Sequence, residues 1–314
     1  MPDVPAKHRA DAAPVRVAMI QMCSGTDQAQ NIADASALIR EAAASGAVYV
    51  QTPEVTNLMV MRTADLFAAA EPAAGNTSVA AFSALAAELG IWLHIGSMVV
   101  RVSDTKCANR AFVFTPAGDI AATYDKIHMF DVDVGGGERY RESKNYAPGS
   151  AAQTVELPWG RLGLAICYDM RFPTLFGAYA SAGVDVTCAP SAFTVSTGTA
   201  HWHTLLRARA IETQTFMLAA AQAGTHTCGR ETYGHSLIVS PWGEVLAEGD
   251  ATSTGVIAAD LDLTALGTAR ARIPTRHHHV PIDTTSLPGP ANKEPASQPQ
   301  SAREHSDVPR VAIA

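Results

Sequence analysis

The sequence predicts an α/β protein built as a four-layer α-β-β-α sandwich, in which two sheets pack together between outer helices. Three observations lead to this fold class. Continuous apolar, strand-like runs alternate with helical segments, as in sheets that are covered by helices. The order strand, helix, strand, helix and then turn-linked strands occurs along the first half and returns along the second. Two such halves imply two sheets packed face to face.

The first half opens with the run RVAMIQM, which is apolar and therefore predicts a strand. An alanine-rich stretch with helical apolar spacing follows, and Gly46 ends it. A buried strand and a second helix come next, and Gly90 ends that helix. The turn Pro116-Ala117-Gly118-Asp119 then joins the last two of three strands as a hairpin. The predicted elements are 16–22, 31–45, 47–51, 77–89, 91–100, 110–115 and 120–124.

The second half repeats this order. Its first strand, LGLAICY, precedes a helix with Pro173 in the first turn, where the missing N–H is tolerated. A strand, a longer helix and another strand follow. A hairpin around the turn Pro241-Trp242-Gly243-Glu244 then leads to the final strand. The predicted elements are 162–168, 173–182, 184–189, 201–214, 215–222, 236–240, 245–247 and 255–261.

Composition limits the class of protein. The 314 residues are 47% hydrophobic and 17% charged, which is typical of a globular chain. We expect one domain at 14–283 and a disordered tail at 284–314, because Thr, Ser, Pro and Gln dominate that tail. The net charge of −7 argues against a nucleic-acid partner and against a polybasic membrane-surface protein. No apolar run approaches the roughly 18–20 residues of a membrane span.

The cysteines and the first residues favour a cytoplasmic protein without metal or cofactor. The five cysteines are widely spaced and form no C-x-x-C pair, so neither a disulfide framework nor a zinc knuckle is expected. Residues 1–13 carry scattered charges and lack the apolar core of a signal peptide. His201, His203 and the run 277–279 have no acidic or thiol partner at ligand spacing, so we expect no metal site.

Polar residues stand where three of the predicted strands end, and layered α/β folds bind ligands at strand ends. Glu54 follows the run AVYVQ, Lys126 follows the hairpin strand in TYDKIH, and Cys167 lies near the end of LGLAICYD. Taken singly, they fit a surface carboxylate, a solvated lysine and a buried small residue. Together they can form a thiol acyl-transfer site. Glu54 would take the thiol proton if burial raises its pKa toward neutrality, and Lys126 would stabilise an oxyanion.

A group of longer segments carries a resemblance to a known family. The segments are TPEVTNLM, YDKIHMFDVDV, RYRESKNYAPG, GLAICYDMRFP, HWHTLLRARAIETQ and YGHSLIVSPWGEVLA. In this order, over residues 16–282, they resemble the nitrilase, or carbon–nitrogen hydrolase, superfamily. The resemblance implies the nitrilase type of α-β-β-α sandwich and a catalytic triad of Glu54, Lys126 and Cys167. It also implies a second glutamate beside the lysine, which matches Glu142 here.

Four segments narrow the resemblance further. KIHMFDVDV, CYDMRFP, APSAFTVSTG and HWHTLLRARAIETQ look most like the amidases that process deaminated glutathione. Omega-amidases, which act on α-ketoglutaramate, share most of these segments. ETYGHS favours the first branch, because omega-amidases tend to carry a longer, Trp-containing version there. The loop 134–137 and Thr199 depart from the relatives, so an omega-amidase, a nitrilase and an N-carbamoyl amidohydrolase remain alternatives.

The resemblance implies a cofactor-independent thiol amidase acting on a small 2-oxo-acid amide. Cys167 would attack the amide carbonyl while Glu54 takes the thiol proton, and water would hydrolyse the resulting thioester. The oxyanion would lie between Lys126 and the backbone N–H of Tyr168. Glu142 would orient Lys126.

The carboxylate of such a substrate needs a cationic partner. Arg171, in CYDMR, is the first candidate because a guanidinium binds a carboxylate through two hydrogen bonds. An ion pair between Arg171 and Asp169 is the alternative. Phe193 and Thr197 match pocket-lining positions of relatives.

The resemblance also implies a homodimer or higher homo-oligomer, with the helices after Cys167 and at 201–214 packed across a two-fold axis. A non-enzymatic binding scaffold is the alternative from a different class. It would be expected to lack a triad member, whereas all of them are present. Apolar residues that fit either the contact between chains or the core of one chain are Phe176, Tyr179, Leu205 and Leu206.

Overall fold

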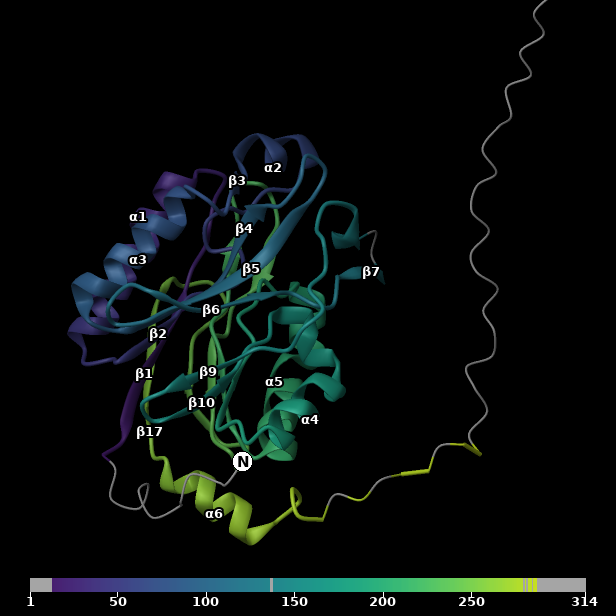
Figure 1. The fold of residues 1–314 in the computed structure, drawn as a ribbon. Helices are drawn as coiled ribbons and strands as arrows, with labels where there is room; N and C mark the ends of the chain where they lie inside the picture. Colours follow the sequence, from purple (N-terminus) through teal and green to yellow (C-terminus); the bar gives the residue numbers. More distant parts are fainter. Residues whose placement is uncertain (1–12, 136–137, 279, 281, 284, 287–314) are drawn as a thin grey trace, which may run out of the picture. The chain divides into compact units, whose positions relative to one another are not determined.

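The computed structural model describes residues 13–135, 138–278, 280, 282–283 and 285–286 (Figure 1). The chain divides into two compact units, Met1–His277 and His278–Ala314. The sheets and helices described below belong to the first unit. Apart from residues 285–286, the expected tail at 284–314 lies outside the described residues, so the predicted domain boundary stays a prediction. No helix in the described ranges is long and apolar enough to cross a membrane.

The first sheet contains the strands of the first half of the chain and one from the end of the domain. In sheet order they are β17 (Gly255–Leu261), β1 (Val15–Gln21), β2 (Tyr49–Gln51), β4 (Trp92–Arg101), β5 (Cys107–Phe114) and β6 (Ile120–Asp125), and β3 (Glu71–Pro72) pairs with β4. The strands β1, β2 and β4 run parallel, whereas β5 and β6 continue the sheet in antiparallel pairing. At the opposite edge, β17 pairs antiparallel with all of β1.

The second sheet has the same pattern of strand directions. Its strands in order are β16 (Val245–Glu248), β15 (Leu237–Val239), β12 (Phe216–Ala219), β11 (Val186–Cys188), β10 (Gly160–Gly163) and β9 (Thr154–Leu157). The central strands β10, β11 and β12 are parallel, with β15 and β16 antiparallel on one side and β9 antiparallel on the other. The repeat predicted from the order of elements is therefore present in the strand topology.

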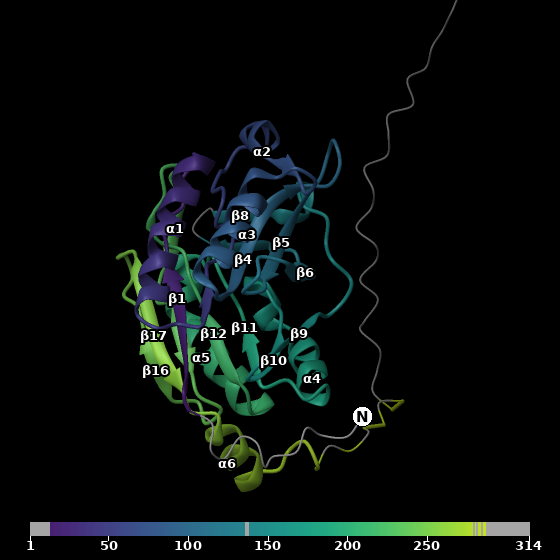
Figure 2. The same ribbon diagram turned by 60° about the vertical axis from the view of Figure 1, so that its left-hand side comes forward.

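Helices cover the outer faces of the sheets, which confirms the predicted α/β sandwich (Figures 1 and 2). The helices α1 (Gln28–Ala44) and α3 (Thr77–Leu89) cover the first sheet, and α4 (Pro173–Ser181) and α5 (Val195–Thr213) cover the second. Strand β1 shows the alternation of faces that this layering requires. Val17 and Met19 belong to the core that contains the second sheet, whereas Ala18 and Ile20 pack in the separate core under α1 and α3.

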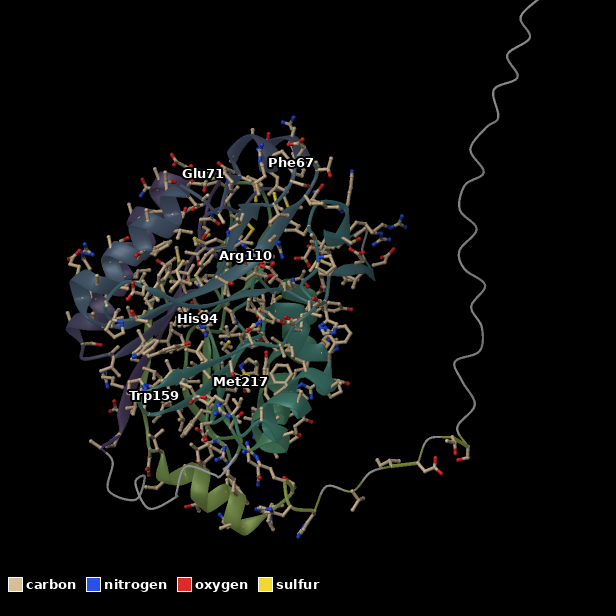
Figure 3. All side chains as sticks on the ribbon, viewed as in Figure 1. Phe67, Glu71, His94, Arg110, Trp159 and Met217 are labelled. Atoms are coloured by element: carbon tan, nitrogen blue, oxygen red, sulfur yellow. The ribbon has the colours of Figure 1, made fainter. Side chains whose placement is uncertain are left out.

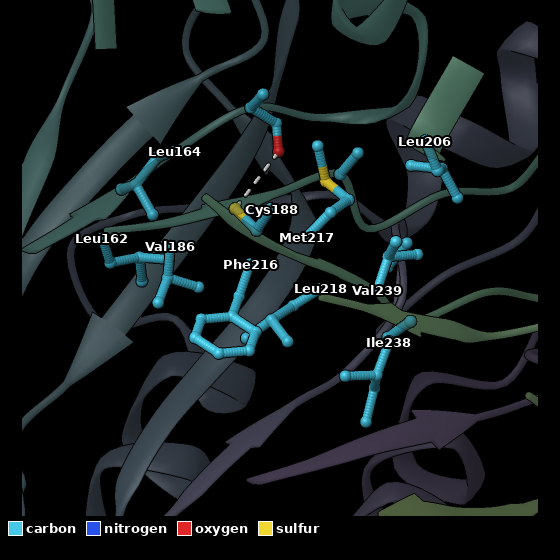
Figure 4. Packing of buried hydrophobic residues seen from close by; sticks show 14 of the residues in the cluster. Leu162, Leu164, Val186, Cys188, Leu206, Phe216, Met217, Leu218, Ile238 and Val239 are labelled. Atoms are coloured by element: carbon cyan, nitrogen blue, oxygen red, sulfur yellow. Dashed lines mark hydrogen bonds between the residues drawn. The ribbon is translucent and has the colours of Figure 1, made fainter. Parts of the chain in front are cut away.

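The core of the second sheet alternates in the same way. Figure 4 shows Met217 of β12 on the side of Leu206, which belongs to α5, and Phe216 and Leu218 on the opposite side. All of these side chains are fully buried or nearly so. Burial on both faces explains why the strands read as continuous apolar runs in the sequence.

Buried polar side chains connect the two sheets near their centre. His94 is fully buried (Figure 3), and its Nδ1 lies 2.7 Å from the hydroxyl of Tyr49 and 3.1 Å from Nε2 of Gln51. Oε1 of Gln51 accepts a hydrogen bond of 3.0 Å from the N–H of Ala220, just beyond β12. Burial lowers the pKa of His94 to about 3, so the ring is neutral in this network.

Local signals set the helix ends. Asp27 caps α1, and Gly90 ends α3 in the left-handed conformation with φ 65°. Helix α5 begins at Val195, earlier than the predicted start at 201, because Thr194 caps it and accepts a hydrogen bond from the N–H of Thr197. Glycine and threonines in its first turns have low helix propensity and hid this start in the sequence.

Shorter elements at the borders of the sheets were not predicted. They are too short for a recognisable apolar period, or too polar. They are α2 (Thr63–Ala69), β3, β7 (Asp131–Gly135), β8 (Glu138–Arg141), β9, β13 (Ala223–Thr225), β14 (Glu231–Tyr233) and α6 (Thr264–Arg272). Two short 3-10 helices, η2 (Glu142–Lys144) and η3 (Cys167–Arg171), were also missed. The predicted strand 162–168 is therefore too long, because β10 ends at Gly163 and Cys167 already belongs to η3.

Candidate active site

Glu54, Lys126 and Cys167 line one cavity of about 210 Å³. Glu54 lies in the loop after β2, Lys126 follows β6 directly, and Cys167 opens η3 after β10. Strand β2 belongs to the parallel part of the first sheet, and β10 belongs to the parallel part of the second. The cavity therefore lies at the carboxyl ends of parallel strands from both sheets. Glu142, the other expected member, lines the same cavity from η2.

Lys126 lies between two carboxylates. Its Nζ is 2.9 Å from Oε1 of Glu54, and 3.1 Å and 2.9 Å from the two carboxylate oxygens of Glu142. The side chains of Lys126 and Glu54 are only 2% and 6% exposed. Oε2 of Glu142 also accepts a hydrogen bond of 2.7 Å from the N–H of Phe130. The ammonium group is thus held in one place by charge-assisted hydrogen bonds.

Asn109 of β5 joins the same two carboxylates. Its Nδ2 donates to Oε1 of Glu54 at 2.9 Å and to Oε1 of Glu142 at 3.1 Å. Both partners only accept hydrogen bonds, which fixes the orientation of the amide. The Asn109 carbonyl oxygen also accepts a hydrogen bond from the N–H of Lys126. The neighbouring pair of Arg110 (Figure 3) and Asp125 makes hydrogen bonds of 2.6 Å and 2.8 Å, which fixes β5 against β6 next to the site.

The environment of Glu54 differs from the one expected from the sequence. Burial alone raises the pKa of its carboxyl group, as predicted, but the positive charge of Lys126 and its hydrogen bond outweigh burial and lower the pKa below its usual value. Oε2 of Glu54 also accepts a hydrogen bond of 2.8 Å from the N–H of Ala192. The resting carboxylate is therefore ionised and able to accept a proton.

The thiol of Cys167 is protonated at rest. Burial raises its pKa, and the negative charge of Glu54 raises it further, against the opposing effect of Lys126. The pKa of Lys126 is raised despite burial, because Glu142 and Glu54 favour its charged form. The site thus combines a neutral thiol, a charged carboxylate whose negative charge raises the pKa of that thiol, and a fixed cation.

Cys167 has an unusual backbone conformation, with φ 49° in a residue other than glycine. Such strain is stored where the surroundings enforce it. The N–H of Cys167 donates to the carbonyl of Pro190 at 3.0 Å, and the N–H of Asp169 donates to that of Ile166. No acceptor within the described residues takes the N–H of Tyr168, so this donor next to Cys167 is free to bind a ligand.

Asp169 holds the turn of Cys167 against the segment that carries Lys126. Its carboxylate is fully buried and accepts hydrogen bonds from the N–H of Ile166 at 2.9 Å and from the hydroxyl of Tyr124 at 2.7 Å. The same carboxylate accepts a hydrogen bond from the backbone N–H of His128, and its Oδ1 lies 2.7 Å from Nδ1 of the His128 ring. Tyr124 and His128 flank Lys126 in sequence. Asp169 was missed as a positioning residue because these partners are distant in sequence.

Gly96 allows the loop of Glu54 to approach the segment that holds Cys167. A Cβ at Gly96 would lie 2.1 Å from the carbonyl oxygen of Thr52 and 2.4 Å from Cβ of Pro190. The first atom belongs to the backbone before Glu54, and Pro190 accepts the hydrogen bond from Cys167. Only glycine therefore fits between the two loops.

The residues expected to bind substrate separate into two groups. Tyr168, Phe193 and Thr197 line the cavity, but Arg171 does not. The guanidinium of Arg171 lies 3.2 Å from Nδ1 of His201 and stacks at 5.3 Å from the ring of Phe193. The alternative ion pair of Arg171 with Asp169 is also absent from the described contacts, because other donors occupy Asp169.

Arginines that the sequence analysis did not assign to the site line the cavity instead. They are Arg139 and Arg141 of the β7–β8 hairpin and Arg230, which precedes β14. A signal was present, since Arg230 lies next to the ETYGHS segment that carries the resemblance. The contact could not be read from spacing, because Arg230 is far along the chain from Glu54 and Cys167.

The expectation about histidines needs a correction. His203 has an acidic neighbour after all: its Nε2 lies 2.8 Å from Oε1 of Glu248, and Nδ1 of His235 lies 2.9 Å from the same oxygen. The carboxylate comes from β16 and was not readable from local spacing. Two imidazole N–H groups donating to one carboxylate oxygen account for this cluster. The histidine run 277–279 was also considered as a metal site, and its last residue, His279, lies outside the described residues.

The residues considered for a contact between chains belong mostly to the core of one chain. Phe176, Tyr179 and Leu206 are 0%, 1% and 0% exposed, and Leu205 packs against the same core. A helix facing a sheet buries one stripe of apolar residues, and these residues form that stripe. Phe176, Tyr179 and Leu206 are therefore buried within one chain, whereas Leu205 is only partly buried.

Comparisons with known proteins place the chain in a family. A family model described as carbon–nitrogen hydrolase matches residues 16–271. The chain is 40% identical over 270 residues to a deaminated glutathione amidase of Bos taurus, covering 84% of this chain and 82% of that protein. It is 38% identical over 259 residues to a human omega-amidase, covering 82% of this chain and 92% of the relative.

A solved structure has the same fold. The NitFhit protein of C. elegans superposes with a TM-score of 0.79 at 34% identity, covering 85% of this chain and 65% of that chain. The present chain therefore spans less than two thirds of the NitFhit chain.

Proposed function

This chain belongs to the carbon–nitrogen hydrolase family, and from that premise we propose that it is a thiol amidase for a small 2-oxo-acid amide such as deaminated glutathione. The observation that carries the proposal is the convergence of Glu54, Lys126, Glu142 and Cys167 in one cavity. Reaction proceeds through a thioester on Cys167 and uses no cofactor.

Glu54 acts as the general base and then as the general acid. It takes the thiol proton as Cys167 attacks the amide carbonyl, and it returns that proton to the departing amine when the carbon–nitrogen bond breaks. Water then attacks the thioester with Glu54 as base, which releases the acid and restores the thiol. The neutral thiol and ionised carboxylate at rest support this order, because no free thiolate is needed before substrate arrives.

Lys126 and the backbone N–H of Tyr168 bind the oxyanion. A lysine ammonium group has three donors. When the two oxygens of Glu142 share one donor and Glu54 accepts from another, the third is left for the substrate oxygen. The N–H of Tyr168 has no acceptor within the described residues. Fixed donors of this kind stabilise the charge that develops in the transition state. Glu142 holds Lys126 in place through its two carboxylate oxygens.

The charges around the cavity support an anionic substrate. Basic side chains that line it outnumber acidic ones, although the whole chain carries a net charge of −7. The basic residues are Lys126, Arg139, Arg141 and Arg230, and the acidic ones are Glu54 and Glu142. A local excess of positive charge concentrates anions at the site. Deaminated glutathione and α-ketoglutaramate both carry carboxylates, and both are candidates.

We also propose that the protein is cytoplasmic and forms a homodimer or a higher homo-oligomer. All five cysteines are free, which fits a reducing compartment. Large apolar side chains remain exposed around the end of α5 and the hairpin of β15 and β16, and Ile211 adjoins Gly243 there. The exposed residues are Ile211, Trp242, Val245 and Leu246. Light scattering at micromolar concentration should give at least twice the mass of one chain, and the mass of a monomer would contradict the dimer.

The release of α-ketoglutarate tests the proposed substrate. Hydrolysis of deaminated glutathione and of α-ketoglutaramate yields this same product, so one coupled assay compares them directly. We expect release from deaminated glutathione at the higher kcat/KM, and none with Cys167→Ala. A higher value for α-ketoglutaramate would assign the chain to the omega-amidases. No release from either would overturn the proposed substrate and direct the search to nitriles and carbamoyl compounds.

A further inference from the structure

The arginines that line the cavity differ in their partners. Arg139 forms an ion pair with Asp133, with Nε and Oδ2 2.9 Å apart. Arg141 donates to the carbonyl oxygens of Val132 and Tyr140, so it is used within the β7–β8 hairpin. Arg230 has no carboxylate within ion-pair distance among the described residues. It is therefore the arginine of the cavity whose charge and hydrogen-bonding capacity are least used.

Arg230 is nevertheless held firmly. Its Nη2 donates to the carbonyl oxygen of Ala192 at 2.6 Å, and its guanidinium carbon lies 5.6 Å from the ring centroid of Tyr140. Its Nη1 makes only a weak contact of 3.9 Å with the sulfur of Met59. Its Nε is buried without a hydrogen-bond partner within the described residues. A partly buried guanidinium without an anion is unfavourable, so this arrangement favours binding of an anion from the cavity.

One peptide unit connects Arg230 to the catalytic end of the site. The carbonyl of Ala192 accepts from Arg230, and the N–H of the same residue donates to Oε2 of Glu54 at 2.8 Å. Burial raises the pKa of Glu54, whereas the charge of Lys126 and then that of Arg230 lower it, which shows that the guanidinium is electrostatically close. An anion bound by Arg230 would therefore lie in the same cavity as the attacking thiol.

We propose that Arg230 is the specificity-determining residue of this enzyme and binds the 2-oxo carboxylate at the far end of the acyl group. The proposal rests on the proposed function. The amide carbonyl lies at Cys167, and the carboxylate at the other end of the acyl chain meets the free face of the guanidinium. This assignment replaces Arg171, which the structure places outside the cavity behind Phe193.

The acyl group sets the class of substrate that Arg230 selects. A planar guanidinium pairs with a carboxylate through two parallel hydrogen bonds, so it favours an acyl chain that ends in an ionised carboxyl group. The leaving amine makes no use of this contact. Substrates with different amines but the same α-ketoglutaryl group should therefore depend on Arg230 to the same extent.

The test compares α-ketoglutaramate with its methyl ester, in which the same amide is present but the carboxylate is uncharged. In the wild type we expect the free acid to be preferred. Arg230→Gln keeps an N–H donor for Ala192 but removes the charge, so kcat/KM for the acid should fall about 100-fold, mainly through KM, with little change for the ester. Arg230→Lys should restore part of the preference.

Arg171→Gln is the control, because Arg171 is the other candidate for binding the carboxylate. This variant should leave the preference for the acid over the ester unchanged. If Arg230→Gln lowers kcat/KM equally for the acid and the ester, or keeps the preference for the acid, the assignment is overturned and a structural role is indicated. Loss of the preference in Arg171→Gln would overturn it as well. If the wild type releases α-ketoglutarate neither from α-ketoglutaramate nor from deaminated glutathione, the proposed function itself fails, and the proposal fails with it.

Discussion

Oε1 of Glu54 lies 2.9 Å from Nζ of Lys126, and both side chains are almost wholly buried. Ions that are removed from water in this way persist only when their partners are in place. Glu142 and Asn109 complete the network from other elements. The groups to which we assign catalysis are therefore also groups on which the stability of the site depends, and this connection leads to the first predictions.

Removal of Lys126 should destabilise the protein as well as inactivate it. Lys126→Met leaves the carboxylates of Glu54 and Glu142 without their cation, and we expect a loss of about 3–5 kcal/mol in the free energy of unfolding. Urea denaturation measures this change. Lys144→Met is the matched control, because Lys144 is exposed, and it should change stability by less than about 0.5 kcal/mol. Equal stability of the two variants would contradict the account of the buried pair.

Glu142→Gln tests whether Glu142 positions Lys126. The amide keeps the shape of the side chain but removes its negative charge and one of the two oxygens that accept hydrogen bonds from Nζ of Lys126. We expect kcat to fall by about 10–100-fold with little change in KM, because the oxyanion contact matters only in the transition state. Steady-state kinetics with the preferred substrate measures the split. A rise in KM at constant kcat would instead make Glu142 a substrate-binding residue.

Activity should persist into acid solution. The folded-state pKa of Glu54 lies below its usual value of 4.5, so the base stays ionised until the pH falls through that lower pKa. Because the pKa is lowered by folding, Glu54 contributes stability above its unfolded pKa and loses it as the pH falls through the folded pKa. The acid limb of kcat/KM should therefore have a midpoint below 4.5. A midpoint near 6 or above would contradict this, provided that circular dichroism shows a folded protein throughout.

The sequence predicted the layered fold and the convergence of Glu54, Lys126 and Cys167 in one cavity, because both depend on local patterns. The strand 255–261 and the helix 77–89 were predicted with their observed bounds, since apolar residues and a terminal Gly90 mark them. The positions of Glu54, Lys126 and Cys167 followed from strand ends and from the resemblance. The roles of Asp169 and Gly96 could not be predicted, because their partners come from distant loops that meet only in the folded chain.

Arg171 and Arg230 show where spacing misleads. Arg171 stands close to Cys167 in sequence, but the 3-10 helix turns it away from the cavity toward His201. Arg230 is remote in sequence and reaches the cavity through the loop between β13 and β14. The direction of the Glu54 pKa was wrong for a related reason. It depends on the balance of burial and charge, and the prediction from the sequence considered burial without the opposing charge of Lys126.

Gly96→Ala should damage both folding and activity. The added Cβ would overlap the carbonyl oxygen of Thr52 at 2.1 Å, and this backbone cannot move without displacing Glu54. We expect a loss of about 1–3 kcal/mol in stability, measured by urea denaturation, and a large fall in kcat. Gly177→Ala is the control. Nothing lies within 4 Å of a Cβ there, and alanine in a helix should increase the free energy of unfolding by about 0.5–1 kcal/mol. Similar effects of the two changes would contradict the close approach at Gly96.

Asp169→Asn should lower activity although Asp169 is not placed in contact with the substrate. The carboxylate accepts hydrogen bonds from Ile166, Tyr124 and His128, and an amide would turn an N–H toward one of these donors. We expect a loss of about 2–3 kcal/mol in stability and a fall in kcat with KM little changed. Asp65→Asn, at an exposed position, is the control and should leave both unchanged. An unaltered kcat in Asp169→Asn would mean that this contact does not position Cys167.

The most direct test of the central claim is mass spectrometry of the enzyme quenched during turnover of deaminated glutathione. The account predicts a mass increase equal to an α-ketoglutaryl group on the peptide that contains Cys167, which disappears when substrate is exhausted. Cys167→Ala should show no adduct and no release of α-ketoglutarate. Continued turnover by Cys167→Ala, or an acyl group on another residue of the wild type, would contradict a thioester mechanism at Cys167.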